Sequence, residues 1–280
     1  MILTDFDYVR PGTLAQALEL LGTGSRAVVL AGGQSLLVDL RTGDTVLEPG
    51  SALLVDVRRL EELRGIRRTE NGSLRIGAAT TLAELAADRR VLDEAPALAQ
   101  AARANGDPQV RNLGTVGGNL AARGRATDLP AAAIAADARV LIAGPAGRRS
   151  VPAEEFAATG APTGSVVTAL TVPPARAGAF VKTADRATRY PVCAVAVRVG
   201  PAGLRIAVTG ATARPVRLRG VEDRLRGTDL GTEAVLAAFR AEPRDRFTPG
   251  RGTSAEYLGH LAGVLTARAL KRAQHLANST

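Results

Sequence analysis

Two short segments that combine paired glycines with small polar side chains constrain this chain more than any other feature. The first runs from Ala31 to Leu37 (AGGQSLL) and the second from Thr115 to Ala121 (TVGGNLA). Glycine has no Cβ, so backbone N–H groups at such positions can close on a phosphate. Paired glycines alone carry little information, but the hydroxyl and amide side chains beside them are informative. We interpret the two glycine segments as opposite sides of a grip on a diphosphate.

Composition indicates a globular protein. With 280 residues and 46% hydrophobic content, the chain can bury a large core and is expected to form two domains. No apolar run approaches the roughly 18 to 20 residues that span a bilayer. Residues 1–7 lack the positive charge and apolar stretch of a signal peptide. We therefore expect no membrane insertion and a cytoplasmic location.

The basic charge does not indicate nucleic-acid binding. The formal net charge is +9, but only Lys182 and Lys271 are lysines, and the arginines are scattered through every segment. Aromatic residues make up 3% of the chain and tryptophan is absent, so almost nothing could stack on bases. We interpret most of this charge as solvated surface, and we expect no nucleic-acid partner.

Cysteine and histidine are too few for a metal centre. One cysteine and two histidines cannot supply a four-thiolate iron–sulfur cluster or an ordinary zinc site, so a redox metal would have to lie on another chain. Cys193 lies in an apolar run and is expected to be a buried strand residue rather than a reactive thiol. His260 and His275 are expected to be surface or packing residues of a C-terminal helix.

Local patterns predict alternating helices and strands. A capping-box pattern at Thr13 opens a helix that ends at Gly22, and Thr81 opens another. Further helices are predicted at 96–104, from Asp128 and, after Thr253, along the C-terminal residues. Strands are predicted at 26–30, 52–57, 74–77, 139–143, 179–183, 192–199 and 204–209. Residues 105–114 contain Gly106-Asp107-Pro108 and are expected to form an irregular loop. We place a domain boundary near Pro173.

With these segments, the chain resembles the FAD-binding medium subunit of the molybdenum hydroxylases, a family that includes xanthine and carbon monoxide dehydrogenases. The matching segments follow the family's order along nearly the whole chain. They are Phe6-Asp7-Tyr8 with Arg10-Pro11, the first glycine segment, residues 107–112 with 115–120, Thr127-Asp128-Leu129-Pro130, the strand around Lys182, and residues 252–257 with His260-Leu261.

The resemblance implies an α+β fold. Residues 1–173 would form a two-lobed FAD-binding domain of the PCMH or CO dehydrogenase flavoprotein type, with lobes at about 1–57 and 58–173. Residues 174–280 would form a smaller domain of antiparallel sheet and helices. An extended FAD would lie between the two lobes.

The resemblance also implies a set of cofactor contacts. Residues 31–35 would bind the pyrophosphate from one side, and Thr115, Gly117, Gly118 and Asn119 from the other. Asp128 would be a hydrogen-bonding partner of the ribose or of nearby backbone, and no residue is assigned to catalysis or to a metal. The FAD-binding residues implied are Leu30, Ala31, Gly32, Gly33, Gln34, Ser35, Leu36, Leu37, Thr115, Val116, Gly117, Gly118, Asn119, Asp128, Val167, Lys182 and Tyr190.

Lys182 and two departures from the family pattern bear on the flavin. Lys182 corresponds to a family lysine near the flavin ring, where an ammonium would stabilise the reduced form; the alternative is a solvated strand charge. Many relatives carry a His-Ala-Asp-Pro-like run where this chain has Ala122-Arg123-Gly124-Arg125, which adds two cations near the site. Arg189 replaces an Asp that usually precedes the aromatic at Tyr190, a residue expected to cover the ring.

The resemblance implies an electron-transfer role. This subunit would pass electrons from an iron–sulfur small subunit through FAD to an external acceptor, while a molybdopterin-binding large subunit oxidises the substrate. The substrate and the acceptor stay open. One alternative is a self-contained FAD oxidoreductase on a related fold, for which we find no Ser, Cys or His placed as a general acid or base. Another is a structural subunit that has lost its flavin.

Overall fold

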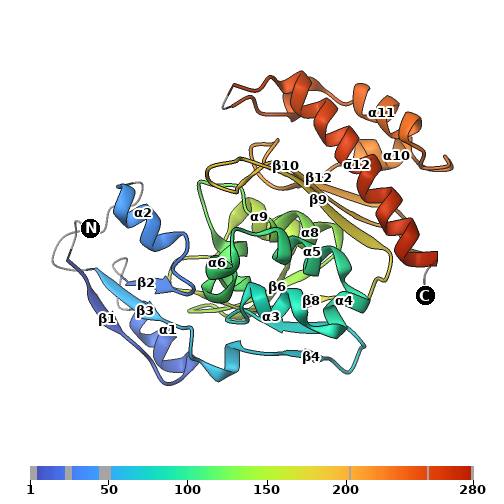
Figure 1. Ribbon diagram of the computed structural model, residues 1–280. Coiled ribbons are helices and arrows are strands. Elements are labelled where there is room, and N and C mark those ends of the chain that lie inside the picture. The colour runs from blue at the N-terminus through green and yellow to red at the C-terminus, as the bar shows by residue number, and fades with distance from the viewer. Residues whose placement is uncertain (1–4, 23–26, 44–51, 202, 251, 279–280) are drawn as a thin grey trace.

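Three β-sheets, each built from a consecutive part of the chain, organise the molecule (Figure 1). The computed structural model describes residues 5–22, 27–43, 52–201, 203–250 and 252–278. The first sheet belongs to an N-terminal lobe, the second to a middle lobe, and the third to a C-terminal domain. No helix in these ranges is long and apolar enough to cross a membrane.

The N-terminal lobe is a small parallel sheet with one helix packed against it. The strand order is β1(Asp7–Val9), β3(Leu53–Asp56) and β2(Ala27–Leu30). Helix α1(Leu14–Gly22) has the predicted bounds, and its start is capped by Thr13 Oγ1, which accepts from the Gln16 N–H at 3.2 Å. The first glycine segment follows β2 directly and leads into helix α2(Leu36–Thr42), which the sequence patterns did not predict.

The middle lobe is an antiparallel sheet covered by helices. Its strand order is β4(Ile66–Arg68), β5(Leu74–Gly77), β8(Val166–Val172), β6(Arg139–Gly144) and β7(Gly147–Pro152). Its helices are η1(Glu61–Leu63), α3(Leu82–Ala87), α4(Arg89–Glu94), α5(Pro96–Ala104), α6(Pro108–Leu113), α7(Val116–Ala121), α8(Leu129–Ala135) and α9(Ala153–Thr159). All residues of α8 are buried, so its alanines let it pack closely in the core.

Residues 105–114 do not form the irregular loop that we expected. Residues 108–113 form helix α6, with Pro108 in its first turn. The Asp107 carboxylate accepts from the Val110 N–H at 2.9 Å, so Asp107 is the N-cap of this helix. The N–H groups in the first turn of a helix have no partner within the helix, so the missing N–H of Pro108 costs no hydrogen bond there. Asp107-Pro108 therefore starts a new helix as well as ending the preceding one.

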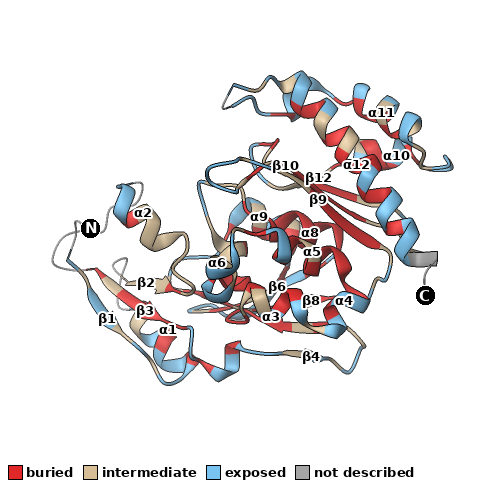
Figure 2. Cartoon of the chain, in the orientation of Figure 1, coloured by how far each residue is buried: buried red, intermediate tan, exposed pale blue. Residues whose placement is uncertain are grey.

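The C-terminal domain is an antiparallel sheet buried on both faces. Its strand order is β12(Val216–Arg217), β11(Arg205–Thr209), β10(Pro191–Arg198) and β9(Gly178–Ala184). One face of the sheet packs on α5 and α8 of the middle lobe, and α12(Ala255–Asn278) covers the other face. Helix α11(Thr232–Arg240) and the short helix η2(Arg244–Arg246) pack against α12, and α10(Arg219–Arg224) packs on β11. Ala194 and Ala196 join the middle-lobe core, whereas Cys193 and Val195 join the core under α12, and Figure 2 shows the strands largely buried.

The single thiol of the chain is buried in this sheet, as predicted. Cys193 is fully buried, and burial raises its pKa to about 12. Because the thiolate is the reactive form, we expect native protein at pH 8 to react negligibly with a thiol reagent. Unfolding in guanidinium should release one reactive thiol per chain. Rapid labelling of the folded protein would contradict this placement.

Candidate functional site

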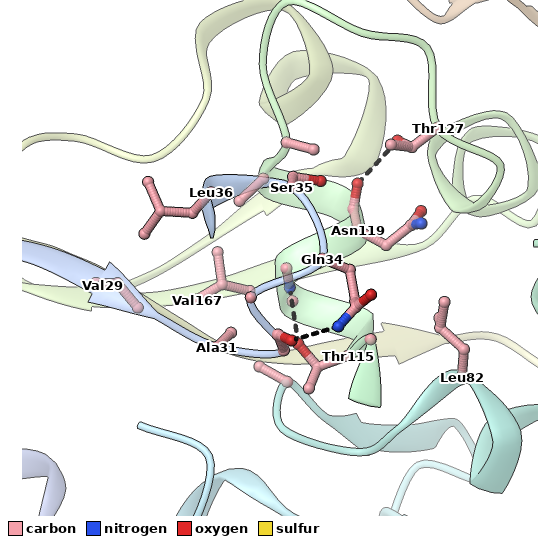
Figure 3. A pocket seen from close by; sticks show the side chains of 18 of the residues that line it. Val29, Ala31, Gln34, Ser35, Leu36, Leu82, Thr115, Asn119, Thr127 and Val167 are labelled. Carbon is pink, nitrogen blue, oxygen red and sulfur yellow. Dashed lines mark hydrogen bonds between the residues drawn. The ribbon is translucent and has the colours of Figure 1, made fainter. Parts of the chain in front are cut away.

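A cavity of about 480 Å³ lies where the three parts of the chain meet (Figure 3). The N-terminal lobe contributes the first glycine segment and Asp39 from α2. The middle lobe contributes the start of α7, Asp128 and β8, and the C-terminal domain contributes the turn at Thr188, Arg189 and Tyr190. This volume is within the usual range for a small-molecule site.

Most of the residues expected to bind FAD line this cavity. The lining ones are Ala31, Gly32, Gly33, Gln34, Ser35, Leu36, Thr115, Gly117, Gly118, Asn119, Asp128, Val167 and Tyr190. Four expected residues lie behind the surface instead. Leu30, Leu37 and Val116 belong to or pack against hydrophobic cores, and Lys182 reaches the site through Asp128.

The glycines are required first by the close packing of the two segments and their neighbours. Gly33 has φ +72°, which favours glycine, and a Cβ at Gly32 would collide with the carbonyl oxygen of Leu113. A Cβ at Gly117 would lie 2.8 Å from the Ala78 Cβ, and one at Gly118 would lie 3.0 Å from Thr115 Oγ1. Because these glycines lack a Cβ, the segments that form the cavity walls can pack against one another, and a ligand can approach their backbone closely.

The backbone N–H groups of the two glycine segments differ in their hydrogen bonding. Within the described residues, the N–H groups of residues 32–36 have no hydrogen-bond partner. The N–H groups of residues 116–119 are all bonded, to Thr80 O, Ala78 O, Thr115 Oγ1 and Thr115 O. Residues 116–121 form helix α7 with Thr115 as its N-cap, so the bonded N–H groups of its first turn are not available as the second half of a grip. Its polar contribution comes from the side chains of Thr115 and Asn119.

A buried ion pair forms the floor beside α8. Asp128 and Lys182 have side chains 1% and 4% exposed, and the Lys182 Nζ lies 2.8 Å from Asp128 Oδ1. Lys182 also donates to the carbonyl oxygen of Ala104 at 3.0 Å, and the Asn105 amide donates to Asp128 Oδ2 at 2.7 Å. Burial raises the pKa of Asp128 to about 6, although Lys182 and Asn105 favour its charged form. Lys182 is therefore not a solvated strand charge.

Arg125 connects the three parts of the chain at the cavity. It forms an ion pair with Asp39 of the N-terminal lobe, and its Nη1 donates to the Tyr190 hydroxyl at 3.1 Å. Of the two cations that distinguish this segment from many relatives, Arg123 lines the cavity, whereas Arg125 is paired with a carboxylate. The charge added at the site is consequently smaller than the sequence suggests.

Sequence reasoning missed several lining residues. Among them are Asp39, Ala78, Ala79, Leu82, Asn105, Gly106, Val110, Ser165 and Thr188. Asn105 had a signal, since a polar residue follows the predicted helix at 96–104 and precedes the matching segment at 107–112. The others depend on tertiary contacts between segments far apart in the sequence.

Known protein families match both halves of the chain. Residues 4–175 match the FAD binding domain in molybdopterin dehydrogenase, and residues 179–273 match the CO dehydrogenase flavoprotein C-terminal domain. These two descriptions agree with the sheet architecture and with a cavity walled by the first match and the start of the second.

Individual relatives agree along the full length. The carbon monoxide dehydrogenase medium chain of Hydrogenophaga pseudoflava is 37% identical, covering 98% of each chain. The glyceraldehyde dehydrogenase medium chain of Sulfolobus acidocaldarius is 31% identical, covering 95% of this chain and 98% of the relative. A solved carbon monoxide dehydrogenase structure from Hydrogenophaga pseudoflava superposes with a TM-score of 0.86 at 34% identity, covering 99% of both chains. The chain therefore belongs to the FAD-binding medium subunits of the molybdenum hydroxylases.

Proposed function

We propose that this chain holds FAD in the cavity of Figure 3 and acts as the electron-transfer subunit of a three-part molybdenum hydroxylase. Its partners would be an iron–sulfur small subunit and a molybdopterin-binding large subunit. When bound, FAD accepts single electrons and can deliver two. The protein's own residues bind the cofactor, orient it and set its electrostatic surroundings. The observation that carries the proposal is the row of unbonded N–H groups at residues 32–36.

The donors and acceptors of the cavity fit FAD. Unbonded N–H groups in the first glycine segment would donate hydrogen bonds to the oxygens of the diphosphate, which is anionic and only accepts hydrogen bonds. Asp128 Oδ1 is buried and accepts no hydrogen bond from the described residues, although it is ion-paired with Lys182. A ligand hydroxyl would satisfy this oxygen. Arg123 adds a cation to the lining and would favour an anionic ligand.

The self-contained oxidoreductase is less well supported. The lining contains no histidine or cysteine, and the hydroxyl of Ser165 donates to the Pro162 carbonyl oxygen. The described residues hold no cluster of His, Cys, Asp or Glu suited to a metal. The cytoplasmic location stays a prediction for experiment.

Two measurements test the proposal. Acid precipitation of the purified, FAD-reconstituted chain should leave a yellow supernatant, because no His or Cys lines the cavity for a covalent flavin bond.

Expression from its own operon should yield a complex with a cysteine-rich small chain and a large molybdenum-binding chain. Substrate should bleach the flavin only in that complex. If the chain alone turned over an organic substrate, the self-contained oxidoreductase would be correct.

A further inference from the structure

A second cavity, of about 610 Å³, lies between the N-terminal lobe and the sheet of the middle lobe. Its lining includes four arginines and one carboxylate. The lining residues are Leu14, Glu62, Arg67, Arg75, Leu141, Ile142, Arg148, Arg149, Ser150 and Thr168. We propose that this cavity is an anion site that binds a small polyphosphate group, separate from the FAD cavity.

The sheet register brings these arginines together. Arg67 on β4 pairs directly with Arg75 on β5, so the two side chains leave the sheet on the same face. Arg148 and Arg149 come from β7 at the opposite edge; as consecutive strand residues they point to opposite faces of the sheet, and Arg148 is the one whose charge acts on Arg75. Leu141 of β6 and Thr168 of β8 lie between the two pairs in the cavity lining. Arg67 and Arg75 from one edge and Arg148 from the other thus converge on one hollow.

The cluster lacks compensating charge. None of the four guanidinium groups has a hydrogen-bond or ion-pair partner among the residues that the structure describes. Glu62 accepts the Leu14 N–H at 2.7 Å through Oε2 and forms no ion pair with them. By contrast, the nearby Arg68 is paired with Glu94.

Burial and mutual repulsion bear on this cluster. Burial, followed by the charges of Arg67 and Arg148, lowers the pKa of Arg75. Like charges placed directly opposite one another in a sheet are unfavourable. A bound anion would relieve this repulsion, which the folded protein alone leaves in place.

The lining favours a phosphate group over other anions. Guanidinium groups match phosphate oxygens with paired N–H donors, and several of them can share one multiply charged ligand. The cavity volume suits a small ligand rather than a folded partner. No aromatic side chain lines it, so a nucleotide base would gain no stacking. Recognition would rest on the phosphate chain itself, whether free or part of a nucleotide.

Calorimetric titration of FAD-loaded protein with tripolyphosphate tests this site, because FAD then occupies the other diphosphate cavity. We expect saturable binding without flavin release, and ATP should bind with similar affinity. Arg75→Ala with Arg148→Ala should weaken binding at least tenfold, about the effect of one lost charged hydrogen bond. If that variant loses its flavin, Arg67→Ala with Arg148→Ala, both exposed, gives the same test.

A control variant removes two arginines from a part of the surface away from this cavity. Arg240 and Arg272 are exposed on α11 and α12, and replacing both with alanine should leave tripolyphosphate binding unchanged. Equal weakening in both variants would mean nonspecific attraction and would overturn the proposal. So would an absence of saturable binding, or binding of a poly-glutamate peptide but not of tripolyphosphate, which would indicate a protein-docking surface. None of these outcomes depends on electron transfer.

Discussion

Replacing Lys182 with methionine is expected to lower the free energy of unfolding by about 3 kcal/mol at pH 8, the usual cost of leaving one member of a buried ion pair alone. Both side chains of the pair are almost fully buried, so solvent screens their interaction little. Denaturant unfolding of the variant and wild type in the same salt measures the difference. Lys271, the other lysine, is exposed on α12, and its methionine variant should change stability by less than about 0.5 kcal/mol.

The loss caused by Lys182→Met should depend on pH. The pKa of Asp128 is about 6 even with Lys182 present, and removing the ammonium should raise it further. At a pH between 3.8 and about 6, Asp128 is protonated in the folded protein but ionised in the unfolded chain. The contribution of Asp128 to the free energy of unfolding therefore rises as the pH falls through this range. The destabilisation should shrink from pH 8 to pH 5.

The double variant Lys182→Met with Asp128→Asn separates charge from packing. At pH 8 it should be less destabilised than Lys182→Met alone, because no buried carboxylate is left without a cation. A loss that is the same at both pH values, and unrelieved in the double variant, would show that Lys182 stabilises the fold through packing alone.

Replacing Arg125 with alanine is expected to weaken FAD binding by about tenfold or more, equivalent to roughly 1.4 kcal/mol. Two effects combine here. The Tyr190 hydroxyl loses its donor, and the Asp39 carboxylate, in the first turn of α2, loses its cation close to the proposed diphosphate position. Flavin fluorescence during titration of apoprotein with FAD measures the affinity, and circular dichroism checks the fold.

Two matched variants assign the effect of Arg125. Tyr190→Phe removes only the hydroxyl and should change FAD affinity by less than Arg125→Ala does. Asp39→Asn in the Arg125→Ala background should recover part of the affinity, because it removes the unpaired carboxylate. If the second change gave no recovery, repulsion by Asp39 would not be the cause.

Local sequence predicted elements whose signals lie within a few residues. Helix α5 and strand β5 have the predicted bounds, since Pro96 opens the helix and apolar residues alternate along the strand. Strands β9, β10 and β11 lie where the sequence predicts strands, whereas β12 is not predicted; the continuous apolar character of β10 reflects a sheet covered on both faces. Helix α6 is not predicted, because Gly106-Asp107-Pro108 has the pattern of a helix breaker although proline also suits the first turn of a helix.

Interactions between distant segments could not be predicted in the same way. The contact of Gly32 with Leu113 joins two walls of the cavity, and nothing near either residue indicates the other. The burial of Lys182 depends on α5 and on Asp128, neither of which is adjacent to its strand in sequence. The family resemblance predicts the cofactor contacts, and the structure distinguishes the residues that line the cavity from those that lie behind them.

The spread of the cavity along the chain has a consequence for biosynthesis. Its lining begins at Val28 and ends at Tyr190, with walls from both lobes and from the turn that precedes β10. A ribosome-bound chain therefore lacks part of the cavity until Tyr190 has left the exit tunnel, and strand β9 is paired along its length only after β10 follows. Flavin loading would thus belong to a late stage of synthesis or to the released chain.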